Sequence, residues 1–149
     1  MQTSTNNTDV DQLNSFLRGE ISAVETYRMA LEKIDRGSVA RAKLETCQRS
    51  HQDRVAILRD AVTAHGGEPA TSSGPWGVFA KAVEGGAKLL GEKVAIAALE
   101  EGEDHGLKDY RSDIQKCDAD TRQLVTAKLL PQQEQTHRMM SNLKKQLAS

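Results

Sequence analysis

One short pattern occurs twice in this chain, at positions that lie far apart. Gly19-Glu20 is followed by Tyr27-Arg28, and Gly102-Glu103 is followed at the same spacing by Tyr110-Arg111. Both copies lie in segments whose apolar residues recur every three to four positions, a spacing that predicts amphipathic helices. Each glutamate lies on the apolar face of its helix, and a glutamate is seldom buried there unless it is paired or bound. The repeat therefore favours a helical bundle in which two equivalent helices each direct one glutamate inward.

The composition agrees with an all-α protein. The good helix formers Ala, Leu, Glu, Lys, Gln and Arg dominate, and aromatic residues make up only 3% of the chain. A length of 149 residues indicates one domain that is large enough to bury a core. Residues 1–8 are polar and are predicted to form a disordered tail, which leaves residues 9–149 as the domain. A net charge of -1 gives no reason to expect nucleic acid or an anionic membrane as a partner.

The cysteines and the N-terminal segment bear on the cellular location. Two cysteines, Cys47 and Cys117, do not make a disulfide framework, and we expect both to be small core residues. The N-terminal segment lacks the apolar centre of a signal peptide, and no later run approaches the length of a membrane span. We therefore expect a cytoplasmic protein.

The first half of the chain predicts an antiparallel pair of helices. Asp9 and Gln12 form a capping box that opens the first helix. Gly37 ends this helix, and Ser38 caps a second one that runs as far as Gly66. Because the turn between the two helices is short, they must lie antiparallel to one another.

The second half predicts a similar pair after a long connection. Residues 66–75 predict a loop, and a short crossover helix follows it. A third helix is predicted over about 92–116, and a fourth helix, capped by Asp118 or Asp120, runs to about residue 147. Pro131 is expected either to kink the fourth helix or to split off a first segment over 121–129. Two antiparallel hairpins joined by a long crossover predict the ferritin-like form of the four-helix bundle.

Several potential metal ligands lie on the inward faces of these four helices. Glu134 and His137 form a Glu-x-x-His pair on the fourth helix, and His51 lies on the apolar stripe of the second. The distances of these residues and of the repeated glutamates from the two turns match, which predicts one level in the bundle. Carboxylates and imidazoles placed in this way build metal sites in bundle cores. The predicted metal ligands are Glu20, His51, Glu103, Glu134 and His137.

The segment from Glu20 to Tyr27 resembles the first helix of the bacterioferritins, and the ligand pattern resembles that of the ferritin-like superfamily, which includes the rubrerythrins. From about residue 10 onward the chain is most similar to a bacterial family of ferritin-like four-helix-bundle proteins of unknown function. The superfamily resemblance implies iron or manganese, one or two ions. It implies terminal carboxylates from the two repeats, with Tyr27 and Tyr110 lining the site. It assigns the imidazole ligands and the bridging carboxylate as His51, His137 and Glu134.

One position departs from this pattern. The second bridging carboxylate is expected at position 48, where the chain has Gln48. An amide offers one neutral oxygen and so cannot bridge two cations as a carboxylate does. The sequence therefore predicts at most about one tight metal ion in the wild type and a gain toward two in Gln48→Glu.

Two classes of function remain open at this point. The first is a metal-dependent oxidase, a peroxide-handling protein or an iron-binding protein. The second is a non-enzymatic stress-associated or partner-binding bundle, in which His51, His137 and the tyrosine hydroxyls hold the two repeated glutamates and no metal is bound. Trp76, Phe79 and Val83 offer an apolar face for a homo-oligomer. His65 is interpreted as a residue that compensates the helix dipole, not as a ligand.

Overall fold

The computed structural model describes residues 2–77, 81 and 91–148, and over these residues the protein is an all-α four-helix bundle with no strand. The four long helices are α1 (Gln2–Lys33), α2 (Arg41–Ala64), α4 (Glu92–Asp113) and α6 (Leu130–Ala148). Shorter elements are η1 (Gly74–Gly77), η2 (Ile114–Lys116), α5 (Ala119–Leu124) and the π-helical segment η3 (Val125–Leu129). The predicted fold class is confirmed. In the part of the chain described, no helix combines the length and the apolar character needed to cross a membrane.

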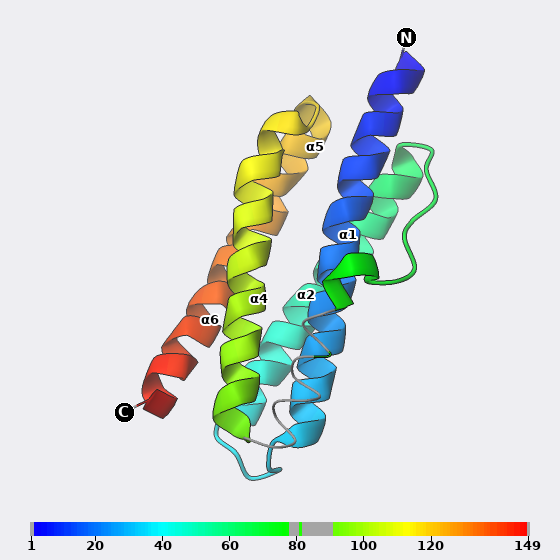
Figure 1. Cartoon of the computed structure of the whole chain (residues 1–149). Helices are drawn as coiled ribbons and strands as arrows, with labels where there is room; N and C mark the ends of the chain where they lie inside the picture. The colour runs from blue at the N-terminus through cyan, green and yellow to red at the C-terminus, as the bar shows by residue number, and fades with distance from the viewer. Residues whose placement is uncertain (1, 78–80, 82–90, 149) are drawn as a thin grey trace.

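The helices form two antiparallel hairpins, α1 with α2 and α4 with α5–α6 (Figure 1). Helices α2 and α4 run in the same direction (Figure 1). This is the predicted topology. Most of the predicted crossover helix, at residues 78–80 and 82–90, lies outside the described residues, as do Phe79 and Val83 of the proposed oligomer face.

The start of α1 differs from the prediction. The helix begins at Gln2, so residues 2–8 have helical backbone where a disordered tail was predicted. Neither proline nor glycine interrupts that segment. Asp9 therefore lies inside the helix and does not cap it. Its carboxylate instead accepts a hydrogen bond from the backbone amide of Asp118, at 3.2 Å.

The turn between α1 and α2 is built by two polar side chains. Arg41 donates to the carbonyl oxygens of Leu31 and Ile34, at 2.8 and 3.3 Å, and so satisfies acceptors at the end of α1. The predicted capping residue Ser38 lies two residues before the N-cap Ala40 and accepts a hydrogen bond from its backbone amide. The Ser38 hydroxyl also bonds to Glu92 at the start of α4, which joins the two hairpins at this end.

The second hairpin follows the prediction at its start and near Pro131, where a separate first segment precedes the last helix. Asp118 caps α5, because its Oδ1 accepts a hydrogen bond from the backbone amide of Thr121 at 2.8 Å. Pro131 is the second residue of α6, and the π-helical segment Val125–Leu129 precedes it. A proline lacks the amide that would continue the regular ladder, and a π-helical turn accommodates such a break.

The core consists of two apolar clusters that flank a polar layer. One cluster lies toward the α1–α2 turn, and its largest members include Tyr27, Leu44, Ile96, Leu99, Met140 and Leu143. The other lies toward the opposite end and includes Leu13, Phe16, Leu17, Leu58, Tyr110 and Leu129. Burial of these side chains supplies the main stabilisation of the bundle.

Candidate functional site

Six polar side chains lie buried together in the middle of the bundle, between the two apolar clusters. Every long helix contributes at least one of them, and each is exposed by 3% or less. We call this set the central layer; its members are Glu20 from α1, His51 and Arg54 from α2, Glu103 from α4, and Gln133 and Thr136 from α6.

His51 bridges the two glutamates of the repeat. Its Nδ1 lies 2.5 Å from Oε1 of Glu20, and its Nε2 lies 2.6 Å from Oε2 of Glu103. Burial alone would lower the pKa of His51, but the negative charges of Glu103 and Glu20 outweigh burial and raise it. Since an ionised carboxylate only accepts hydrogen bonds, an imidazolium with two N–H donors matches this arrangement.

Arg54 is completely buried and supplies a second positive charge to the layer. Its Nη1 donates to Oε2 of Glu20 at 3.3 Å and to Oε1 of Gln133. Its Nη2 donates to the hydroxyls of Thr136 and Ser50, at 3.0 and 3.1 Å. A buried arginine is stable only when its charge is paired and its donors are satisfied. With two carboxylates, one guanidinium and one imidazolium, the central layer is neutral.

The remaining acceptor positions of the two glutamates are occupied by protein donors. Tyr110 donates to Oε2 of Glu20 at 2.6 Å, and Tyr27 donates to Oε2 of Glu103 at 2.5 Å. Oε1 of Glu103 accepts from Gln133 and Thr136 (3.0 and 2.7 Å). All four carboxylate oxygens therefore have a protein donor.

The electrostatic environment keeps both glutamates ionised. Burial raises the pKa of Glu20, but the charges of Arg54 and His51, with hydrogen bonds from His51 and Tyr110, outweigh burial and lower it to about 2. Burial likewise raises the pKa of Glu103, and the charge of His51 and its hydrogen bond reverse the shift, so that the net pKa is lowered. Burial is also the main reason that the pKa values of Tyr27 and Tyr110 lie well above 10, so both remain hydrogen-bond donors.

Three of the five predicted metal ligands, Glu20, His51 and Glu103, meet in the central layer. Glu134 and His137 do not, and their predicted inward positions are wrong. The side chain of Glu134 is 41% exposed and pairs with Arg111 at 3.2 Å. That of His137 is 25% exposed and lies 3.7 to 3.8 Å from carboxylate oxygens of α4. The reason is helix register: the inward face of α6 carries Gln133 and Thr136, each one residue before a predicted ligand, and continues through Met140 and Leu143.

In α2 only two positions differ by one residue, since Cys47 and Arg54 are buried where Gln48 and Val55 were predicted. Its buried face carries Leu44, Cys47, His51, Arg54, Leu58 and Val62. Gln48, which was assigned to the place of a bridging carboxylate, is half-buried, and its amide donates to the carbonyl oxygen of Val24 at 3.4 Å. It lies outside the central layer.

The donor set does not fit a two-metal centre. In a carboxylate-bridged bundle two helices each supply a Glu-x-x-His pair with residues three apart. Here the inward pairs with that spacing are His51-x-x-Arg54 and Gln133-x-x-Thr136. Only two carboxylates and one imidazole are common metal ligands, and both imidazole nitrogens lie against carboxylate oxygens. Arginine always carries its positive charge and offers no lone pair to a metal ion.

A small cavity lies beside the central layer, between α1 and α4. Its volume is about 50 Å³, and its lining includes Gly19, Gly102 and Gly106 together with the side chains of Glu20 and Glu103. That volume holds a few water molecules. It is far below the roughly 300–1,000 Å³ of typical small-molecule sites.

Both cysteines are buried in the apolar clusters. Burial is the largest cause that raises the pKa of the Cys47 thiol to about 12 and that of the Cys117 thiol to about 11. Since the thiolate is the reactive form, neither residue is a nucleophile at neutral pH.

Comparison with known proteins gives one match. A family model described as "Domain of unknown function (DUF2383)" matches residues 8–116. The matched range includes Glu20, His51, Arg54 and Glu103 of the central layer, and it ends before α5 and α6. No curated protein and no solved structure matches the chain.

Proposed function

The chain belongs to the family described as a domain of unknown function (DUF2383), and we propose that this member is a non-enzymatic helical bundle of the ferritin-like type. In this proposal the central layer is an ion-pair network that replaces a metal centre. The two hairpins with their long crossover, and the inward glutamates on α1 and α4, support the kinship with ferritin-like proteins. The cytoplasm remains the proposed location.

The position of Arg54 carries this proposal. Its guanidinium is fully buried, bonds to Glu20 and is held by Gln133 and Thr136. Two ferrous ions would bring four positive charges to a layer that has only two carboxylates. They would also have to displace a guanidinium and an imidazolium from those carboxylates. The charge balance therefore favours the protein's own cations over metal ions.

A metal-dependent oxidase is the less favoured function. It needs additional carboxylate and imidazole ligands, and the two residues predicted for that role, Glu134 and His137, lie outside the central layer, where they pair with side chains of α4. The small volume of the cavity beside the layer also argues against an organic substrate.

Aerobic addition of ferrous iron to chelator-treated, untagged protein tests the proposal. We expect no near-ultraviolet absorption of an oxo-bridged iron pair and no iron retained at the central layer after desalting. Glu134→Gln/His137→Gln is the matched control, and it should behave like the wild type. Two retained irons per chain with that absorption band in the wild type would overturn the proposal and restore the oxidase function.

A further inference from the structure

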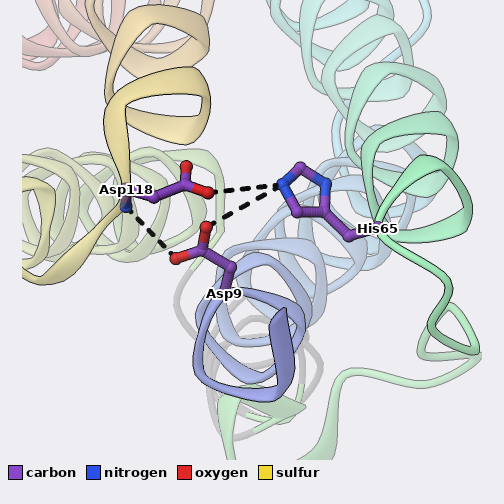
Figure 2. A group of neighbouring side chains, drawn as sticks. All are labelled: Asp9, His65 and Asp118. Atoms are coloured by element: carbon purple, nitrogen blue, oxygen red, sulfur yellow. Dashed lines mark hydrogen bonds and ion pairs between the residues drawn. The ribbon is translucent and has the colours of Figure 1, made fainter. Parts of the chain in front are cut away.

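Three side chains from distant parts of the chain converge at the end of the bundle opposite the α1–α2 turn (Figure 2). Asp9 comes from α1, His65 is the C-cap residue of α2, and Asp118 is the N-cap residue of α5. Nε2 of His65 lies 3.8 Å from Oδ2 of Asp9 and 3.8 Å from Oδ2 of Asp118. One ligand atom from each residue lies within 4.8 Å of the others.

The ring of His65 is held in one orientation by the backbone. Its Nδ1 lies 2.9 Å from the carbonyl oxygen of Ala61. A carbonyl oxygen only accepts hydrogen bonds, so Nδ1 carries the hydrogen and donates it. In the neutral ring the lone pair is then on Nε2, which points toward both carboxylates (Figure 2). A histidine whose other nitrogen donates to a backbone carbonyl is the usual arrangement of a metal-ligating imidazole.

Each carboxylate is oriented in the same way, by a hydrogen bond to its other oxygen. Oδ1 of Asp9 accepts from the backbone amide of Asp118 at 3.2 Å. Oδ1 of Asp118 accepts from the backbone amide of Thr121 at 2.8 Å. Both Oδ2 atoms are thereby directed at Nε2 of His65. Oδ2 of Asp9 also accepts a hydrogen bond from the hydroxyl of Thr121, at 3.4 Å. The protein thus orients all three side chains so that one nitrogen and two oxygens face the same point.

The distances suit a metal ion better than a direct hydrogen bond. A separation of 3.8 Å is too long for a hydrogen bond between nitrogen and oxygen. Two donor atoms bound to one tetrahedral zinc ion at about 2.1 Å lie about 3.4 Å apart, so 3.8 Å needs a side-chain adjustment of only a few tenths of an ångström. Asp9 is only 2% exposed, and a buried carboxylate needs a compensating charge.

We propose that Asp9, His65 and Asp118 bind one divalent transition-metal ion of the zinc type. Two carboxylates and a neutral imidazole balance its double positive charge. The side chains of His65 and Asp118 are 18% and 31% exposed, so the ion has access from solvent and a water molecule completes its coordination. The ion ties α1, the end of α2 and the α4–α5 turn together, which gives it a structural role. The site is separate from the central layer, so zinc here is compatible with the metal-free central layer proposed above.

Calorimetric titration of chelator-treated, untagged protein with zinc tests the proposal. We expect one zinc ion per chain and an increase of the melting temperature when zinc is added. Asp118→Asn is the sharpest variant, because asparagine also caps a helix but lacks the negative charge. Asp118→Asn and His65→Gln should each lower the zinc affinity about tenfold or more. His105→Gln, which removes an exposed histidine of α4, should leave it unchanged.

Two measurements on the wild type do not depend on how the variants fold. Cobalt(II) should give the visible absorption of a nitrogen- and oxygen-ligated ion. Zinc should shift the nitrogen NMR signal of His65 Nε2. No zinc binding in the wild type, or an unchanged Nε2 signal on zinc addition, would overturn the proposal. Equal zinc affinity in the wild type and in folded Asp118→Asn would also overturn it.

Discussion

Tyr27 of the first repeat donates its hydroxyl hydrogen to Glu103 of the second repeat, at 2.5 Å. The reverse pair, Tyr110 with Glu20, has a distance of 2.6 Å. Helices α1 and α4 run antiparallel (Figure 1), so the tyrosine of each copy lies level with the glutamate of the other. The equal spacing of Glu and Tyr in the two repeats therefore lets each tyrosine reach the glutamate of the other helix.

Arg54→Met is expected to destabilise the protein by about 3–5 kcal/mol, because it removes one partner of a buried ion pair and leaves Glu20 undercompensated. Urea denaturation measures the change. Arg59→Met, at an exposed position of the same helix, is the matched control and should change the stability by less than about 0.5 kcal/mol. Equal effects of the two substitutions would contradict a neutralising role for Arg54.

The ionisation of Glu20 should determine part of the acid stability. Its pKa in the folded protein is about 2, against an ordinary value of 4.5. The lowered pKa contributes stability that is complete above about pH 4.5 and is lost as the pH falls toward 2, by about 3 kcal/mol in total. Glu20→Gln should be less stable at neutral pH and should lose less stability in this range. Glu32→Gln, at a half-exposed position of α1, should keep the wild-type slope.

The ionisation of His51 should act in the opposite direction. Its pKa is raised in the folded protein, so the stability it contributes is complete below its ordinary pKa of 6.5. This contribution is lost as the pH rises through the folded value. Denaturation curves of the wild type between pH 6 and pH 10 should show the decline, and His51→Gln should not. If the wild type and His51→Gln keep a constant difference in stability over this range, His51 is not the titrating group.

Gly106 provides room for the amide of Gln133. A methyl group at this position would lie 2.8 Å from Nε2 of Gln133 and 3.2 Å from its Cδ. Gly106→Ala should therefore destabilise the bundle by about 1–3 kcal/mol through overpacking, although alanine is favoured in a helix by about 1 kcal/mol. Gly37→Ala, where no atom lies within 4 Å, is the control for thermal melts. A higher melting temperature for Gly106→Ala would show that the Gln133 amide moves freely.

Four substitutions in the central layer should create the metal centre that the sequence alone suggested. His51→Glu, Arg54→His, Gln133→Glu and Thr136→His together give two Glu-x-x-His pairs and four carboxylates for two ferrous ions. This variant should bind two irons per chain and form the near-ultraviolet band in air. Gln48→Glu, which the sequence had suggested for this purpose, should bind no more iron than the wild type, because position 48 lies outside the layer. A folded quadruple variant that binds no iron would contradict the assignment of these positions.

The sequence predicted the hairpins and two inward glutamates because these features depend on local signals. The short turn at Gly37-Ser38 required antiparallel helices, and the apolar stripes placed Glu20 and Glu103 inward. Helix register was harder to predict. At the start of α6 the adjacent residues Leu129 and Leu130 permit two inward faces one residue apart, and only packing selects the one with Gln133 and Thr136.

Arg54 escaped prediction for a different reason. Arginine is rarely buried, so hydrophobic periodicity places its apolar neighbour Val55 on the inward face instead. The sequence signal that could have found Arg54 is its helical spacing. It lies three residues after His51, on the helix face that also carries Cys47 and Leu58. The Asp9, His65 and Asp118 group had no signal at all, because its members are separated along the chain and meet only when the bundle forms.

The central layer divides its charge unequally between the two hairpins. The α1–α2 hairpin carries Glu20 with both cations, His51 and Arg54, whereas the second hairpin brings only Glu103. Each hairpin alone therefore has an unbalanced charge of one sign on the face it must bury. Docking the hairpins neutralises this charge in the same step. A chain with one hairpin detached would have to bury an unpaired charge in order to close its core. The two halves are electrostatically complementary fragments, and this complementarity couples their folding.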